Sequence, residues 1–327
     1  MNKVRWGLVS TANINAMLIP AIRASERGEL VAVASRSQEK SDAYAAEWQI
    51  PRSFGSYEAM LASDEVDAVY ISLPNHLHAE WSIKAMEQGK HVLCEKPFAL
   101  TVEDVDRMRD VSEATGMVLA EAFMYRHHPQ TKIAGEFIRG GNLGDVTVVR
   151  GIFNFKMEGR ENVRLVPGWG GGAVWDIGCY PISISQFLLG GPPMWVFGDQ
   201  WLGDSGVDEL FSGTMHYTGG RMAQFSCSFM TPFHTFVEVS GTNGRLTMSE
   251  PFRMDLGGDR LLFYPIEGEP QVIEVPEESL YSGEVRDMHE AILEGAAPYL
   301  SLEETRNHIR TIVALYESAA EHRPVRL

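Results

Sequence analysis

A chain of 327 residues with 44% hydrophobic content is long enough for about two domains and a sizeable core, so no disulfide or metal is needed to hold it together. Its 28 Lys and Arg against 44 Asp and Glu give a net charge of −16 without any run of like charges, which argues against nucleic acid or a membrane as partner. Cys94, Cys179 and Cys227 lack CxxC spacing, and we see no signal peptide or long apolar span, so we expect a soluble, cytoplasmic protein with reduced thiols.

Residues 1–122 alternate short apolar runs with helical patterns, which is typical of a parallel α/β sheet. The predicted strands are 4–9, 30–34, 68–73, 91–94 and 117–120. The predicted helices are 13–24, 37–48, 57–61, 79–88 and one that Thr101 caps and Gly116 ends.

The pattern changes after Glu121, and residues 123–327 read as an α+β domain with a large, mostly antiparallel sheet. Predicted strands are 146–155, 211–217, 222–229, 236–241 and 245–248; predicted helices are 130–139, 175–189, 284–293 and 302–320. Asn243-Gly244 indicates a hairpin, and Ser301-x-x-Glu304 a capping box. An open sheet of this kind often pairs subunits, so we expect a homodimer or higher homo-oligomer.

The turn after the first strand reads Ser10-Thr11-Ala12-Asn13-Ile14, with no glycine where the G-x-G-x-x-G nucleotide fingerprint has three. It is either a phosphate-binding helix start or an ordinary strand–helix turn. Ser35-Arg36-Ser37 ends the second strand, with Lys40 one turn later. An arginine there favours NADP over NAD, because it can bind the 2′-phosphate; otherwise Arg36 is a solvated surface residue.

Polar residues follow two further strands. Leu73-Pro74-Asn75 would line the cofactor, with His76 or His78 capping the next helix; a His-x-His metal site lacks a third ligand nearby. Glu95-Lys96-Pro97 places an ammonium at the carboxyl edge of the sheet, where ligands bind in α/β folds. It is a site residue or a lysine paired with Glu95.

Gly170-Gly171-Gly172 precedes a helix on which Asp176 and Tyr180 share a face. They are either site residues or a core tyrosine beside an exposed aspartate. With Lys96, they suggest an active site that draws on both domains.

Taken together, these tracts resemble the Gfo/Idh/MocA family of oxidoreductases, nearest to its dihydrodiol dehydrogenase and NADP-dependent D-xylose dehydrogenase branch. The resemblance covers nearly the whole chain and rests on residues 6–12, 35–37, 70–78, 89–97, 121–130 and 170–181. That branch has Ser-Thr-Ala in place of the glycine fingerprint.

The resemblance implies a Rossmann domain followed by a sheet domain that pairs subunits. By position, Lys96 matches the family lysine, Tyr180 the catalytic tyrosine of that branch, and Asp176 an acid that binds substrate hydroxyls. Inositol-type relatives have histidine where this chain has Tyr180, which disfavours inositols. We expect NADP (NAD is possible) to contact Ser10, Thr11, Ala12, Asn13, Ile14, Ser35, Arg36, Ser37, Lys40, Leu73, Pro74, Asn75, His78, Glu95, Lys96, Arg126 and Trp169.

The expected function is hydride transfer between NADP and a secondary hydroxyl or carbonyl of a sugar-like or vicinal-diol substrate. Arg126, His127 and Trp169 would lie near the nicotinamide and substrate. A keto-sugar reductase would use the same residues. A non-catalytic NADP-binding regulator should have lost Lys96 or Tyr180, and an NAD-dependent glycosidase is opposed by Arg36. The substrate and the direction of reaction stay open.

Overall fold

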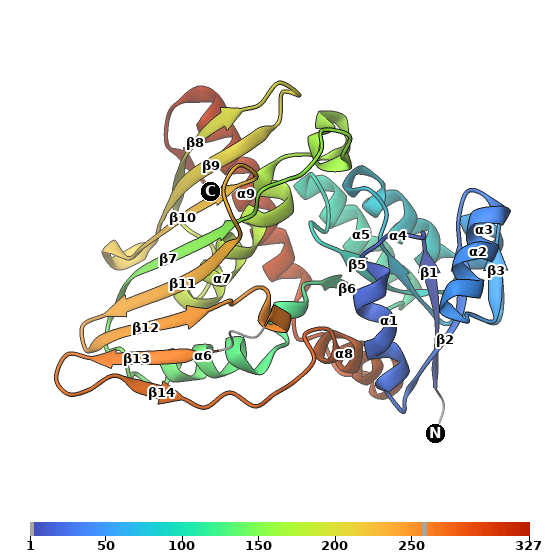
Figure 1. The fold of residues 1–327 in the computed structure, drawn as a ribbon, viewed down its shortest axis with the longest axis horizontal. Coiled ribbons are helices and arrows are strands. Elements are labelled where there is room, and N and C mark those ends of the chain that lie inside the picture. The colour runs from blue at the N-terminus through green and yellow to red at the C-terminus, as the bar shows by residue number, and fades with distance from the viewer. Residues whose placement is uncertain (1–2, 257–259) are drawn as a thin grey trace. The chain divides into compact units, whose positions relative to one another are not determined.

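The computed structural model describes residues 3–256 and 260–327, and the chain divides into two compact units (Figure 1). The first unit comprises Met1–Met124 and Tyr281–Arg306; the second comprises Tyr125–Leu280 and Asn307–Leu327. The boundary expected after residue 122 lies two residues from the observed one. The expected second domain, however, ran on to residue 327, whereas Tyr281–Arg306 packs with the first unit.

The first unit contains a six-stranded parallel sheet in the order β3-β2-β1-β4-β5-β6. Its strands are β1 (Val4–Val9), β2 (Gly28–Ala34), β3 (Arg52–Phe54), β4 (Ala68–Ile71), β5 (His91–Glu95) and β6 (Leu119–Ala122). Its helices are α1 (Asn15–Ala24), α2 (Gln38–Trp48), α3 (Tyr57–Leu61), α4 (His78–Glu87), α5 (Val102–Thr115) and α8 (Ser282–Glu294). This strand order is that of the Rossmann fold, so the predicted α/β class is confirmed.

Local sequence signals account for several of these boundaries. Ser37 accepts a hydrogen bond from the Lys40 N–H at the start of α2, and Thr101 does the same for the Asp104 N–H at the start of α5. Gly116 ends α5 at φ 70°, in the left-handed region that favours glycine. The strand predicted at 117–120 lies two residues later, as β6.

Long-range contacts explain why α8 joins the first unit. The Trp6 indole of β1 donates to His289 Nε2 on α8 over 3.0 Å, and the Thr305 hydroxyl donates to Glu121 Oε2 over 2.9 Å. Helical periodicity identifies a buried face but not the core against which that face packs. The return of residues 281–306 therefore could not be read from the pattern.

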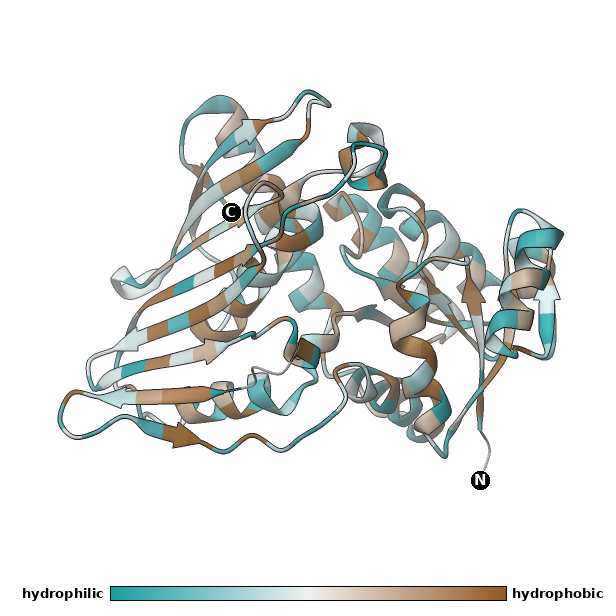
Figure 2. Ribbon diagram, viewed as in Figure 1, coloured by the Kyte–Doolittle hydropathy of each residue, from teal (hydrophilic) through white to brown (hydrophobic). Residues whose placement is uncertain are grey.

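The second unit contains a nine-stranded sheet in the order β14-β13-β12-β11-β7-β10-β9-β8-β15. Its strands are β7 (Val146–Asn154), β8 (Trp195–Leu202), β9 (Asp208–His216), β10 (Met222–Ser228), β11 (His234–Gly241), β12 (Gly244–Ser249), β13 (Leu261–Pro265), β14 (Gln271–Ile273) and β15 (Val325–Arg326). Among the strand pairs of the described residues in this unit, only β7–β10 is parallel, which confirms the mostly antiparallel sheet. In Figure 2 several of these strands alternate between apolar and polar residues, as expected for a sheet with one buried face.

Helices cover one face of this sheet. They are α6 (Pro129–Arg139), α7 (Cys179–Leu189) and the second-unit part of α9 (Leu302–Glu321). Glycines in the strands allow close approach: a Cβ on Gly151 would lie 2.7 Å from Pro181 of α7, and one on Gly213 would lie 3.0 Å from Leu315 of α9. On the opposite face Phe197, Trp201 and Leu210 are exposed.

Two expectations about this unit need correction. Gly241 pairs with Gly244, so the two-residue hairpin loop is Thr242-Asn243 and not Asn243-Gly244. Strand β8 was missed because its exposed side includes Trp201 and Leu202, and this removes the apolar–polar alternation by which strands are recognised. The capping box was predicted correctly: Ser301 Oγ accepts from the Glu304 N–H, and the Ser301 N–H donates to Glu304.

Candidate active site

The turn between β1 and α1 replaces the missing glycines with a network of small polar side chains. Ser10 has φ 124°, in the region that favours glycine. Its hydroxyl contacts Ser72 Oγ at 2.8 Å and accepts from the Ala12 N–H, while Asn15 donates to the Ser10 carbonyl over 2.9 Å. These bonds hold a serine in a glycine-like conformation.

This turn fits the pyrophosphate of a dinucleotide. Among the described residues, the backbone N–H groups of Thr11, Asn13 and Ile14 have no hydrogen-bond acceptor. They lie between the carboxyl end of β1 and the N-terminus of α1, where peptide dipoles favour an anion. Because the strand order reverses between β1 and β4, the crevice of a Rossmann sheet lies at this point.

The end of β2 offers positive charge, and its first carboxylate is Glu39 on the first turn of α2. Arg36 is exposed and lies beside Tyr57. Burial raises the pKa of Tyr57, and the charge and hydrogen bond of Arg36 oppose that rise. Ser35 is buried and Ser37 caps α2, while Lys40 is exposed on the first turn of the helix. Such a pair of cations suits a 2′-phosphate.

The segment after β4 contains one predicted residue in an unexpected role. His78 is fully buried, with its two ring nitrogens 2.8 Å from the carbonyls of Leu73 and Pro97. It therefore links the loops after β4 and β5, and its side chain is occupied by the protein. Neither His76 nor His78 caps α4, because the N-cap is Leu77 and makes no side-chain bond. Pro74 and Asn75 are half-buried.

Lys96 follows β5 at the same carboxyl edge and is half-buried. The preceding Glu95 is buried and accepts hydrogen bonds from the Tyr70 hydroxyl and, over 3.2 Å, from the Lys96 N–H. The Glu95 carboxylate thus fixes the backbone from which the Lys96 side chain projects. The Lys96–Pro97 peptide bond is cis.

In the second unit, Asp176 lies in a π-helical turn, Val174–Gly178, that leads into α7 and Tyr180. Single π-turns inside helices are frequent at functional sites. The Tyr180 ring is buried among Tyr125, Phe153 and Phe252, with centroids 5.2 to 5.6 Å away. The ring is thus part of an aromatic core.

Arg164 is the site residue that the sequence did not indicate. Its Nε donates to Asp176 Oδ2 over 2.5 Å. The pKa of Arg164 is raised first by the charge of Asp176, against the opposing effect of burial, and also by Tyr180. Asp176 and Tyr180 thus both act on the charge of one guanidinium. The clue in the sequence was an arginine before a glycine run, which is too common to single out.

Asp208 of β9 binds the backbone of the same π-helical turn. It is 2% exposed and accepts hydrogen bonds from the Val174 N–H at 2.8 Å and the Tyr316 hydroxyl at 2.7 Å. Burial raises its pKa to about 7, although these bonds lower it. A Cβ on Gly172 would lie 2.0 Å from Asp208 Oδ1. The glycine is needed for this close approach.

The remaining predicted residues differ in exposure. The Arg126 guanidinium carbon lies 4.3 Å from the ring centroid of Phe187, and the residue is 3% exposed. It is thus a cation packed on an aromatic ring. His127 is also buried, whereas Trp169 is 42% exposed.

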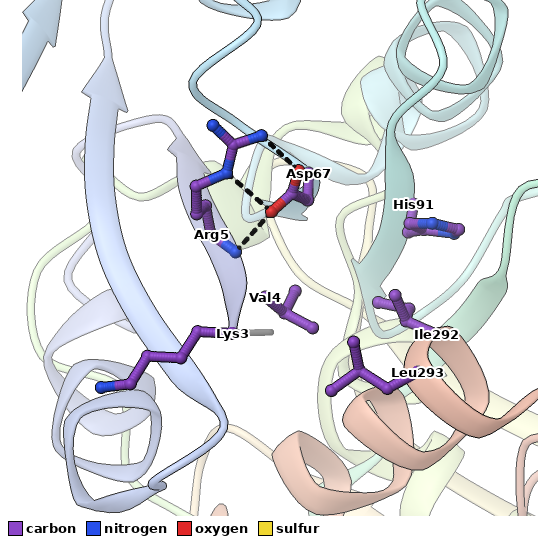
Figure 3. Close-up of a pocket in the computed structure, with 7 residues that line it drawn as sticks. All are labelled: Lys3, Val4, Arg5, Asp67, His91, Ile292 and Leu293. Atoms are coloured by element: carbon purple, nitrogen blue, oxygen red, sulfur yellow. Dashed lines mark hydrogen bonds and ion pairs between the residues drawn. The ribbon is translucent and has the colours of Figure 1, made fainter. Parts of the chain in front are cut away.

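A pocket of about 430 Å³ lies at the opposite, amino edge of the parallel sheet (Figure 3). The Arg5 guanidinium forms two hydrogen bonds with Asp67 in its wall. His91 and the apolar residues Ile292 and Leu293 complete it. It is remote from the strand ends at which the turn and lysine described above lie, and we assign it no part in the site.

No helix in the described part of the chain is long and apolar enough to cross a membrane. Within residues 3–256 and 260–327, no three or more His, Cys, Asp or Glu side chains are grouped as metal ligands. All three cysteines are buried, and none of them is in a disulfide.

Comparisons with known proteins agree with this geometry. Residues 4–123 match the oxidoreductase family with an NAD-binding Rossmann fold, and residues 131–247 match the GFO/IDH/MocA C-terminal domain. D-xylose 1-dehydrogenase (NADP(+)) 2 of Haloferax volcanii is 39% identical over 96% of this chain and 97% of its own. Trans-1,2-dihydrobenzene-1,2-diol dehydrogenase of Mus musculus is 28% identical over 80% of each chain.

Among solved structures, a 3-ketoreductase from Actinomadura kijaniata in complex with NADP and TDP-benzene superposes with a TM-score of 0.91. It is 27% identical, and the match covers 97% of this chain and 98% of that one. Variants of the same enzyme at one lysine and at one tyrosine have also been solved. In that chain these two positions are separated by the same number of residues as Lys96 and Tyr180 are in this one.

Proposed function

Because the chain belongs to the Gfo/Idh/MocA family of oxidoreductases, we propose that it transfers hydride between NADP and a secondary hydroxyl or carbonyl of a sugar-like or vicinal-diol substrate. The observation that carries the proposal is the Asp176–Arg164 pair beside Tyr180. Such a group can bind hydroxyls and move a proton. The similarity to an NADP-dependent xylose dehydrogenase and to a dihydrodiol dehydrogenase supports the substrate class.

Tyr180 is assigned as the proton-transferring group. A free tyrosine has a pKa of about 10 and is a poor base at neutral pH. Nearby cations favour its phenolate form, and Arg164 is one such cation. In the oxidative direction Tyr180 takes the hydroxyl proton, and in the reductive direction it returns the proton to the carbonyl oxygen.

Lys96 is assigned as the second cation and as a hydrogen-bond donor to the reacting oxygen. Asp176 is assigned to a neighbouring substrate hydroxyl, from which its carboxylate accepts a hydrogen bond. The equal spacing of a lysine and a tyrosine chosen for substitution in the related 3-ketoreductase supports the pairing of Lys96 with Tyr180.

NADP supplies the hydride acceptor or donor when it is bound. The N–H groups of Thr11, Asn13 and Ile14 are assigned to its pyrophosphate, and Arg36 with Lys40 to its 2′-phosphate. The absence of a carboxylate at Ser35-Arg36-Ser37 supports NADP over NAD, because NAD-type sites carry an acid there to bind the ribose hydroxyls.

A keto-sugar reductase is the second candidate. It is favoured by the similarity to the 3-ketoreductase over nearly the whole chain. The same residues serve both directions, since proton and hydride transfer are reversible at one carbon. Direction then depends on which substrate is present.

We also propose a cytoplasmic homodimer that pairs through the open face of the nine-stranded sheet. Exposed Phe197, Trp201 and Leu210 on that face support the pairing. The proposal of a reducing compartment is supported by the absence of a disulfide at the buried Cys94, Cys179 and Cys227.

The first test is nucleotide reduction followed by absorbance, with NADP and NAD separately, across D-xylose, D-glucose, an inositol and a trans-dihydrodiol. We expect turnover with NADP and an aldose or diol. Tyr180→Phe should lower kcat by about 10²- to 10⁴-fold, because it removes the proton-transferring oxygen. Binding of NADPH should be nearly unchanged.

Loss of NADPH binding with unchanged residual turnover would contradict the role of Tyr180. Tyr217→Phe is the matched control, because Tyr217 is also a buried tyrosine of the second unit but has no part in the proposed reaction. An absence of turnover with every polyol, together with oxidation of NADPH in the presence of a keto sugar, would favour the reductase.

A further inference from the structure

Arg164 is held at three points. Its N–H donates to Asn162 Oδ1 over 3.0 Å, and its carbonyl accepts from the Gly172 N–H over 2.9 Å. Its Nε donates to Asp176 over 2.5 Å. The backbone of the loop and the end of the side chain are therefore both fixed relative to the helix that carries Asp176 and Tyr180.

The two terminal nitrogens of Arg164 are not used by the protein. Among the described residues, neither Nη1 nor Nη2 donates a hydrogen bond to the protein. The side chain remains 42% exposed, whereas that of Asp176 is 15% exposed. A guanidinium fixed through Nε alone keeps up to four N–H donors in a rigid plane.

Donors and acceptors thus stand side by side. The Asp176 carboxylate accepts the Arg164 bond, and both oxygens of a carboxylate can accept hydrogen bonds. Two adjacent hydroxyls on a carbon chain present a hydrogen on one and an oxygen lone pair on the next. The Asp176 carboxylate can accept the hydrogen of one hydroxyl, and the Nη groups of Arg164 can donate to the oxygen of the next.

We propose that Arg164 is a specificity residue that donates a hydrogen bond to a second hydroxyl, next to the one bound by Asp176. The pair then selects vicinal diols over singly hydroxylated substrates. The inference rests on the proposed function. It assigns a role in recognition to a loop residue outside the Lys96, Tyr180 and Asp176 set.

The competing explanation is purely structural: the ion pair would only fasten the loop to the helix. The two explanations differ in what a substitution changes. A structural tie affects all substrates alike, whereas a hydroxyl contact affects only substrates that carry that hydroxyl.

The test compares Arg164→Met with the matched control Arg160→Met, which removes an arginine of the same loop that pairs with Glu209 instead. KM and kcat are measured with D-glucose, 2-deoxy-D-glucose and 3-deoxy-D-glucose, or with the corresponding D-xylose series if that sugar is preferred. Melting temperature and NADPH affinity are measured for each variant.

We expect Arg164→Met to raise KM by about 10- to 100-fold for the parent sugar, which is the usual effect of losing a hydrogen bond to a charged group. For one of the two deoxy sugars the wild type should already have a high KM, and the substitution should change it less than about twofold. Arg164→Lys should recover part of the affinity, because it restores a donor but not the fork. Arg160→Met should behave as the wild type.

An equal rise in KM for all three sugars would overturn the inference, as would a fall in melting temperature with unchanged KM. Either result would identify a structural tie. Absence of wild-type turnover with every polyol and keto sugar would instead overturn the proposed function, and the inference with it.

Discussion

Glu284 of α8 is a buried carboxyl group without a hydrogen-bond partner among the described residues. It is 1% exposed, and neither of its side-chain oxygens is bonded. Burial raises its pKa well above the usual value, and the charges of Glu95 and Asp287 raise it further. Such surroundings favour the uncharged form of the Glu284 carboxyl group.

Glu284→Gln is therefore expected to reduce the pH dependence of stability. Above about pH 4.5 the unfolded chain releases the Glu284 proton, whereas the folded chain keeps it. The contribution of this group to stability therefore falls as the pH rises from about 4.5 through the raised pKa of the folded chain. The substitution should remove a slope of up to about 1.4 kcal/mol per pH unit. Thermal unfolding of both proteins between pH 5 and 8 measures it.

Glu294→Gln provides the control, since this carboxylate on the same helix is 58% exposed and pairs with Arg27. It should leave the slope unchanged. Parallel curves for the wild type and Glu284→Gln would mean that Glu284 is ionised in the folded chain.

At the scale of elements, the segment Gly170–Gly172 followed by the π-turn sets the position of Asp176. The Arg164 carbonyl binds the Gly172 N–H on one side, and Asp208 binds the Val174 N–H on the other. The glycine run is thus held between a loop and a strand, and the helix that it begins has little freedom to shift.

Gly172→Ala is expected to destabilise the protein and to lower kcat. Gly172 has φ 129°, and an added Cβ would lie 2.0 Å from Asp208 Oδ1. Backbone strain alone costs about 1 to 3 kcal/mol, and displacement of Asp208 would move Asp176 as well. Denaturant unfolding and steady-state kinetics measure the two effects.

Gly168→Ala is the comparison, because nothing lies within 4 Å of a Cβ at that position and its φ is ordinary. It should be close to neutral. If both substitutions had the same small effect, the fit between Gly172 and Asp208 would not be important for the site.

At the scale of the whole molecule, the large sheet has one face covered by helices and one that exposes apolar side chains. Trp201 and Leu210 are register partners on β8 and β9, and both are exposed. Exposed neighbours of this kind mark an interaction surface. A second copy of the chain is the occupant that we propose.

Leu210→Glu is therefore expected to convert the dimer to a monomer, because it would bury two like charges across a symmetric interface. Val313→Glu, on the helical side of the same unit and also 38% exposed, should leave the assembly intact. Sedimentation equilibrium distinguishes the two. An unchanged dimer in Leu210→Glu, or a monomeric wild type, would rule out this face as the interface.

The sequence alone was enough to predict the strands and helices that local physics controls. Periods of two and 3.6 residues, capping side chains and turn glycines act over a few residues. The parallel α/β sheet, the mostly antiparallel second sheet and the cap at Thr101 were predicted on that basis. Lys96, Asp176 and Tyr180 were nominated from their places at strand and helix ends.

Only the tertiary structure decided which groups meet. The burial of His78 between two carbonyls, the return of α8 to the first unit and the Arg164–Asp176 pair all join segments that the chain separates. Ser10 likewise adopts a glycine conformation because Ser72, in the loop after β4, holds it there. Local sequence determines the elements, whereas contacts between distant segments depend on packing, which no local pattern encodes.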